Sequence, residues 1–296
     1  MLIATQVFIL FIVVLVGAIC RRLGYFTDET IRGMTQLLVN VTLPCTTLVN
    51  MQRPFSREVL MGFLLTLGIA IALMVFSYLL GAWLFRRRPR AKRAVLAGMM
   101  AFSNCGFMGY PVILAVNPDW MIYAVAYNVA YVIVSWTLGI SLYEGNEGIS
   151  LRRIVLNPNL IAAALGFALF CLNVTLPDVP SQALALIGGL TTPLSMLIVG
   201  TRVYGVRLSD FKDMDYHVYA ALRLLALPVA LWALLRAFGA PYAVLGTAFL
   251  LTAMPGGTLP GMQAELYGGD KAFAARAAAY TTLLSLASVP LVCMLL

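Results

Sequence analysis

Charged residues are scarce in this chain. They make up 11% of its 296 residues, 61% are hydrophobic, and the mean hydropathy is +0.91. Soluble domains carry roughly a quarter charged residues. This deficit excludes an ordinary soluble domain and predicts an integral membrane protein. Arg21 and Arg22 follow the first apolar run rather than preceding it, so we expect a retained span there and not a signal peptide.

The sequence also lacks the usual residues of metal and nucleophilic sites. His217 is the single histidine, and the five cysteines include no C-x-x-C pair. Zinc needs three or four converging ligands, and a hydrolase needs a nucleophile with a base, or a metal motif. No H-E-x-x-H or G-x-x-x-x-G-K-[ST] motif occurs. We therefore expect no metal, no cofactor and no ATP-driven transport, while a membrane-embedded enzyme or sensor stays an alternative.

Long apolar runs separated by short loops dominate the sequence instead. Ten runs have about the length needed to cross a bilayer, and they cover residues 2–20, 29–51, 58–85, 94–116, 120–143, 158–174, 182–201, 216–235, 242–264 and 276–295. With the N-terminus outside, fifteen basic residues fall in cytoplasmic loops and three in the opposite loops. The positive-inside rule then places both termini outside. It also accounts for the basic cluster 86–93 and for the net charge of +8 without a nucleic-acid partner.

The polar stretch 144–153 divides the chain into two sets of five spans, residues 1–145 and 154–296. Because five is odd, the second set must enter the membrane from the opposite side. A spacing of 67 residues recurs between prolines in corresponding spans, Pro44 with Pro111 and Pro193 with Pro260. We predict an all-α fold of two inverted five-helix repeats, an architecture typical of secondary transporters.

Two spans carry helix breakers near the bilayer centre. Span 4 contains "SNCGFMGYP" at residues 103–111, and span 9 contains "MPGGTLPG" at residues 254–261. Asn104 lies about ten residues into its span, or roughly 15 Å deep at 1.5 Å per residue. Non-helical backbone at that depth is tolerated only where it is buried in protein or lines a wet cavity. A pair of interrupted helices in matching positions predicts a transporter binding site.

The two breaks favour an anionic ligand. Proline is preferred at the first helical position, so we expect Pro111 and Pro260 to start the second half of each broken helix. Each start leaves free N–H groups and the positive end of a helix dipole, which together suit a carboxylate. The candidate substrate-binding residues are Asn104, Cys105, Gly106, Gly109, Tyr110, Pro111, Pro255, Gly256, Gly257, Pro260 and Gln263, with Asn40 and Asn128 as further polar residues deep in spans 2 and 5.

Ionisable residues within the spans are few. We expect Arg223 in span 8 to extend to the cytoplasmic interface, as long basic side chains do, and Glu265 in span 9 to have an interfacial role. A sodium-coupled carrier would need deep acidic or clustered polar ligands for a hard cation. Their scarcity argues against a sodium-coupled organic anion symporter of the bile-acid type, which stays an alternative.

Several motifs resemble the auxin efflux carrier family, which includes plant auxin exporters and bacterial malate or malonate permeases. They are "LVNVTLPCTTLV" in span 2, "SNCGFMGYP" in span 4, "NPNLIAAALGF" in span 6, "TTPLSMLIVGTRV" in span 7 and "TAMPGGTLPGMQAELYG" in span 9. The resemblance covers essentially the whole chain. Two positions depart from the family pattern, Cys105 where threonine is frequent and Tyr110 where a small aliphatic residue is frequent.

This resemblance implies ten spans in which spans 4 and 9 are broken and cross at the site. It also implies a scaffold of spans 1, 2, 6 and 7, a mobile transport domain of spans 3–5 and 8–10, and a homodimer. Asn104 and Pro111 match the family's site asparagine and crossover proline, and Pro255–Pro260 matches the second crossover. The expected function is secondary transport of small organic carboxylates in a bacterial-type inner membrane, surrounded by lipid, by an elevator movement.

Overall fold

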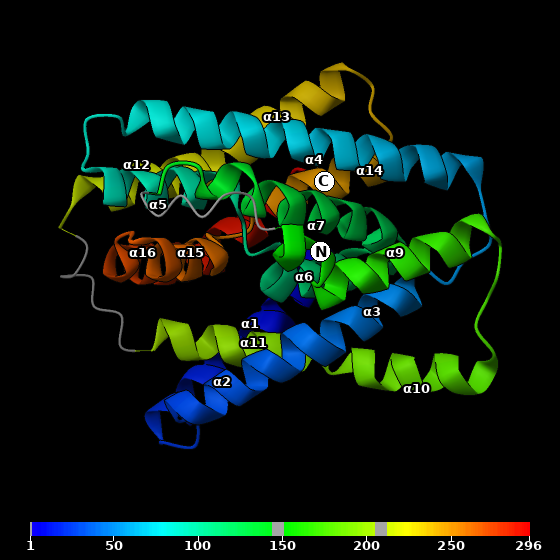
Figure 1. Ribbon diagram of the computed structural model, residues 1–296. Coiled ribbons are helices and arrows are strands. Elements are labelled where there is room, and N and C mark those ends of the chain that lie inside the picture. The colour runs from blue at the N-terminus through cyan, green and yellow to red at the C-terminus, as the bar shows by residue number, and fades with distance from the viewer. Residues whose placement is uncertain (1, 144–150, 205–211) are drawn as a thin grey trace.

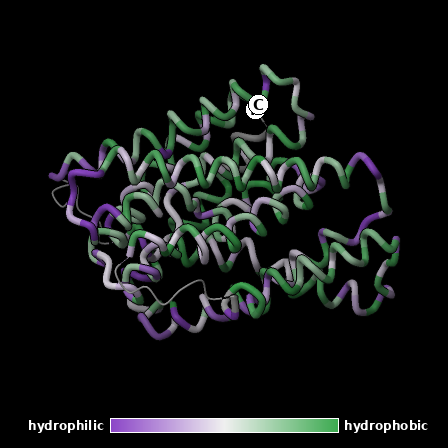
Figure 2. The backbone as a smooth tube through the Cα atoms, turned by 45° about the horizontal axis from the view of Figure 1, so that its top comes forward, coloured by the Kyte–Doolittle hydropathy of each residue, from purple (hydrophilic) through white to green (hydrophobic). Residues whose placement is uncertain are grey.

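The computed structural model describes residues 2–143, 151–204 and 212–296, and within these ranges the regular elements are helices (Figure 1). Five helical runs are long and apolar enough to cross a membrane: Arg57–Leu84, Pro118–Ile140, Asp178–Val203, Met214–Ala237 and Lys271–Cys293. Three shorter apolar helices accompany them: Cys105–Val116, Pro158–Cys171 and Tyr242–Ala253. Hydrophilic segments gather at the two ends of the bundle, and the helices between are mostly hydrophobic (Figure 2).

One group of helices forms one side of the molecule (Figure 1). α1 (Leu2–Arg22) packs along α11 (Thr191–Val203), and α3 (Leu43–Asn50) packs between α9 (Pro158–Cys171) and α10 (Asp178–Gly189). A short π-turn, Leu38–Thr42, joins α2 (Asp28–Leu37) to α3. α1 and α11 approach closely because Gly17 has no side chain. A Cβ added there would overlap the backbone of Leu197. Such small-residue contacts are typical of helix pairs in membranes.

The remaining helices form a second group. α4 (Arg57–Leu84) packs against both α5 (Arg90–Ala101) and α7 (Met121–Trp136), and α14 (Tyr242–Ala253) packs against α7 and α13 (Leu227–Ala237). α16 (Lys271–Cys293) contacts α5, α14 and α15 (Leu259–Tyr267). The shorter helices are α6 (Tyr110–Val116), α8 (Leu151–Val155) and α12 (Met214–Ala221).

In the part of the chain that the structure describes, three π-turns interrupt the helices, and each ends two residues before a proline. Leu38–Thr42 precedes Pro44, Cys105–Gly109 precedes Pro111, and Leu222–Ala226 precedes Pro228. Proline lacks an N–H and clashes with the carbonyl four residues earlier. A wider turn relieves that clash without ending the helix, and π-turns are frequent at functional sites. These prolines therefore widen a helix locally instead of breaking it.

Candidate functional site

The two glycine- and proline-rich stretches meet backbone to backbone. α5 ends at Ala101 and α14 ends at Ala253, and Ser103 forms an antiparallel bridge with Gly256. The Asn104 N–H donates to the Pro255 carbonyl at 2.8 Å, and the Gly257 N–H donates to the Phe102 carbonyl at 2.9 Å. We call residues 102–104 and 254–258 the crossing. Its hydrogen bonds satisfy peptide groups that the ended helices leave open, which a buried backbone requires.

Glycine is required where the two segments meet. A Cβ added at Gly257 would lie 2.9 Å from the Ser103 carbonyl oxygen and 3.0 Å from the Phe102 carbonyl oxygen. A Cβ at Gly256 would overlap the Tyr219 hydroxyl. Backbone atoms cannot move aside as a flexible side chain does, so the close approach depends on the missing side chains.

The helix resumes after the first half of the crossing earlier than expected. It starts at Cys105 with the π-turn Cys105–Gly109 and continues into α6. The Asn104 carbonyl accepts the N–H groups of Met108 at 3.1 Å and Gly109 at 3.0 Å. Pro111 therefore lies inside this helical run, because the π-turn accommodates it, and does not start it. Pro260 does lie in the first turn of α15, as predicted.

This earlier start changes which N–H groups lie at the beginning of the helical run. Cys105, Gly106 and Phe107 open the helical run Cys105–Val116, and the first residues of a helix have no intrahelical acceptor for their N–H groups. All three residues line a cavity of about 280 Å³ beside the crossing. The positive end of the helix dipole thus points to a cavity wall, an arrangement suited to an anion.

This cavity, the crossing cavity, lies between the two groups of helices. The first group contributes Thr35, Val39, Leu43, Asn157 and Asn159, and the second contributes Ser103, Asn104, Cys105, Gly106, Phe107, Asn128, Tyr131, Val132, Trp136, Thr258, Leu259 and Met262. Four of the predicted site residues, Asn104, Cys105, Gly106 and Asn128, are therefore brought together.

An amide network fixes the orientation of one cavity wall. The Asn159 Nδ2 donates to the Asn128 Oδ1 at 2.8 Å, and the Thr47 hydroxyl donates to the Asn159 Oδ1 at 2.7 Å. The Asn128 Nδ2 faces the Cys105 sulfur at 3.5 Å. Buried amides paired in this way hold one orientation. Sequence reasoning missed Asn159 and Thr47, although each lies in a stretch that carries the family resemblance.

The other predicted residues do not line the crossing cavity. Gln263 is fully buried, and its Nε2 donates to the Ser135 carbonyl at 2.7 Å, which joins α15 to α7. Asn40 is exposed, because the face of this span that lines the cavity carries Thr35, Val39 and Leu43. Gly109, Tyr110, Pro111, Pro255, Gly256 and Pro260 are buried around the crossing, and Gly257 lines a neighbouring cavity.

The expectation for Arg223 was wrong. Its side chain does not reach the interface but is buried, with 1% of its surface exposed. The Nη1 donates at 2.9 Å to the carbonyl of Met100, in the last turn of α5. A cation there complements the negative end of the α5 dipole. Within the described ranges Arg223 has no ion pair, and its Nε and Nη2 have no hydrogen-bond partner, so a positive charge remains close to the crossing.

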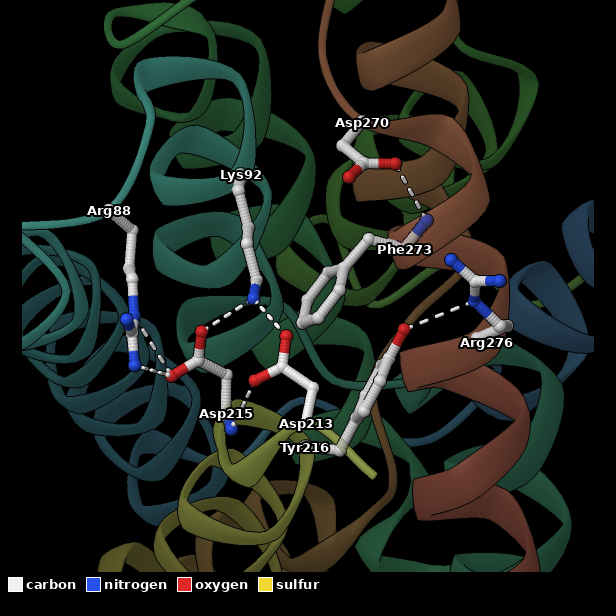
Figure 3. Close-up of polar contacts among 8 residues, drawn as sticks. All are labelled: Arg88, Lys92, Asp213, Asp215, Tyr216, Asp270, Phe273 and Arg276. Carbon is white, nitrogen blue, oxygen red and sulfur yellow. Dashed lines mark hydrogen bonds and ion pairs between the residues drawn. The ribbon is translucent and has the colours of Figure 1, made fainter. Parts of the chain in front are cut away.

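A charged cluster ties α5 to α12 at one end of the bundle (Figure 3). Asp215 is buried and pairs with Arg88 at 2.8 Å and with Lys92 at 2.6 Å, and Lys92 also pairs with Asp213. Burial raises the pKa of Asp213, but the hydrogen bond from Lys92 and nearby positive charges outweigh burial and lower that pKa overall. Burial lowers the pKa of Lys92, and the two carboxylates more than reverse this effect. The cluster 86–93 therefore holds helices together, a role that charge counting did not predict.

Comparisons with known proteins identify a family of membrane transport proteins. A family model described as "Membrane transport protein" matches residues 2–150 and 146–293. The chain is 25% identical over 207 residues to "Uncharacterized transporter MJ1031" of Methanocaldococcus jannaschii, across 66% of this chain and 67% of that protein. It is 22% identical over 236 residues to "Uncharacterized transporter YfdV" of Escherichia coli strain K12, across 74% of each chain. Both relatives are named as transporters.

Proposed function

The chain belongs to the auxin efflux carrier family of membrane transport proteins, and from this premise we propose that it is a secondary transporter of small organic carboxylates. The substrate carboxylate binds in the crossing cavity, at the N–H groups of Cys105, Gly106 and Phe107, with Asn104 and Asn128 beside it. The observation that carries this proposal is the positive end of the helical run Cys105–Val116 facing a cavity lined with amides.

The cavities support a route to the site from one side of the membrane. The crossing cavity shares Trp136, Asn157 and Met262 with a larger cavity of about 690 Å³, which also reaches Arg152. Arg152 belongs to the side that charge counting assigns to the cytoplasm. We propose that the structure represents a conformation accessible from the cytoplasm, with both termini outside a bacterial-type inner membrane.

We also propose the elevator mechanism of alternating access for this chain. The group of α1, α2, α3, α9, α10 and α11 would be the scaffold, and the other helices would move as the transport domain. Two features support this division: the helices of each group pack mainly within their own group, and the crossing cavity lies between the groups. Rigid movement of one group against the other would then expose the site to each side in turn.

The proposed membrane topology is ten spans in two inverted repeats. α5 with α6 and α14 with α15 would be the two halves of spans 4 and 9. The paired peptide groups of the crossing support this arrangement, because interrupted helices at the repeat interface are typical of transporter sites. A homodimer in the lipid bilayer, as the family resemblance implies, belongs to the same proposal.

The test is uptake of labelled malate, malonate and benzoate by proteoliposomes, with and without sodium. We expect saturable uptake of at least one acid and, for Asn104→Ala, a loss of about tenfold or more in kcat/KM, because a charge-assisted hydrogen bond contributes about 1.5–3 kcal/mol. Asn117→Ala is the matched control, since Asn117 lies outside the crossing cavity. Unchanged kinetics in folded Asn104→Ala would overturn the site, and a strict sodium requirement would favour the symporter alternative.

A further inference from the structure

A second cavity reaches the crossing from the other side of α15. Its volume is about 610 Å³, and its walls come from α11, α15 and α16. The face of α16 in this cavity carries alanines, and Gly261 opposes it from α15, so small side chains leave the space open. Thr258 lines this cavity and also the crossing cavity. The two cavities therefore lie on opposite sides of α15, and both border the crossing at Thr258.

Arg202 contributes a positive charge to this second cavity. Counting basic residues along the sequence had assigned it to a loop, whereas the structure places it in the last turn of α11, only partly exposed. Within the described ranges no carboxylate pairs with Arg202. Its guanidinium carbon lies over the Phe107 ring, 5.8 Å from the ring centroid. The other two charged residues of the cavity, Glu265 and Lys271, pair with each other at 3.6 Å. Of the three charged residues that line this cavity, Arg202 is thus the one without an ion-pair partner among the described residues.

The position of Arg202 relates this charge to the proposed substrate site. Phe107 belongs to the first turn of the helical run that begins at Cys105, and it also lines the crossing cavity. Arg202 comes from the opposite group of helices, on α11. An anion in the second cavity would therefore meet a planar guanidinium, which binds carboxylates through two parallel hydrogen bonds. The alanine face beside it suits the apolar part of an organic acid.

We propose that Arg202 forms an access subsite for the substrate carboxylate, a second binding position that an acid occupies before it reaches the amides of the crossing cavity. This inference rests on the proposed transport function. It extends that function by assigning charge selection to a residue of α11, outside the cavity that contains Asn104. The ligand class is an organic monocarboxylate or dicarboxylate with a small apolar body.

The experiment compares Arg202→Gln and Arg202→Lys with the unmodified protein. Sealed vesicles that contain the transporter in a single orientation, prepared for each of the two orientations, give the KM for malate, malonate and benzoate on each side of the membrane separately. We expect Arg202→Gln to raise KM by about tenfold or more from the side of the membrane on which Arg202 lies, because the variant loses a charged hydrogen-bond donor to the carboxylate. The change in KM from the other side should be smaller. Arg202→Lys keeps the charge and is expected to recover most of the loss.

The matched control is Arg236→Gln. Arg236 also lies over an aromatic ring, with its guanidinium carbon 5.0 Å from the Trp232 centroid, but it does not line this cavity. A change in kcat alone, or equal changes from both sides, would overturn the access subsite while leaving the proposed function intact. If the unmodified protein neither transports these acids nor is thermally stabilised by them, the proposed function fails and the subsite with it.

Discussion

Both halves of the crossing are short non-helical segments between two helices, but their residues have different surroundings. In the first half, three residues separate α5 from the next helical turn. The last of them, Asn104, lines the crossing cavity with its amide, and Cys105, Gly106 and Phe107 line it from the start of that turn. In the second half, five residues separate α14 from α15, and Pro255, Gly256 and Gly257 supply close backbone contacts. The first half lines the crossing cavity, where we propose that the substrate binds, and the second half packs tightly against it.

The two helix ends at the first half of the crossing also differ in whether a charged side chain covers them. The negative end of α5 is covered by the buried Arg223, while the positive end at Cys105 stays open to the crossing cavity. An uncovered pair of ends would partly cancel because the two dipole charges have opposite sign. Covering only one of them leaves the local potential positive. This difference is the electrostatic basis on which we propose that a nearly neutral stretch of chain binds an anion.

The largest effect on stability and transport should come from adding a side chain in the second half of the crossing. Gly257→Ala places a Cβ against two backbone carbonyls, and overpacking of this kind costs about 1–3 kcal/mol. We expect a lower thermal midpoint and loss of transport. Gly68→Ala on α4 is the control, because no atom lies within 4 Å of its added Cβ. Normal uptake by Gly257→Ala would contradict the close approach at the crossing.

A smaller effect is expected when the first half loses its buried cation. Arg223→Leu should raise KM for an anionic substrate by about tenfold, because a unit charge near the site contributes on the order of 1 kcal/mol at an effective dielectric constant near 20. Arg223→Lys, which keeps the charge, should lie closer to the unmodified protein. Vesicle uptake measures KM, and thermal melting in detergent detects misfolding. A lower kcat with an unchanged KM in Arg223→Leu would mean that the side chain has only a packing role.

The smallest effect on stability is expected in the charged cluster that links α5 to α12. α5 leads into the first half of the crossing. The folded pKa of Asp213 is lowered below its usual 3.8. Its stabilising contribution is therefore fully present above pH 3.8 and is lost as the pH falls through the folded value. Asp213→Asn should lower the thermal midpoint only modestly at neutral pH, because the Asp213 side chain is 42% exposed and water weakens its ion pair. The gap from the unmodified protein should narrow as the pH falls below 3.8.

The pKa of Lys92 is raised above its usual 10.5, so its contribution is fully present below pH 10.5 and disappears only as the pH rises through the folded value. Between these two limits the difference between Asp213→Asn and the unmodified protein should not vary with pH. Melting curves at closely spaced pH values test this plateau. A gap that changes between pH 5 and pH 8 would assign the effect to another titrating group.

Composition and local pattern determined the class of this protein and the two stretches that form its candidate site. Scarce charge indicated a membrane protein, and breakers at residues 103–111 and 254–261 marked the stretches that meet at the crossing. These features are local, because hydropathy and helix breaking act over a few residues. The resemblance to the auxin efflux carrier family rested on the same stretches.

The tertiary structure decided which side chains act together. Asn159 joins Asn128 from a helix 31 residues further along the chain, Asn40 turns to an exposed surface, and the helix starts at Cys105 because a π-turn precedes Pro111. It also placed Arg223 inside the bundle and Arg202 in a cavity wall. Sequence alone cannot assign such positions, because whether an arginine reaches water or a buried carbonyl depends on which helices pack around it.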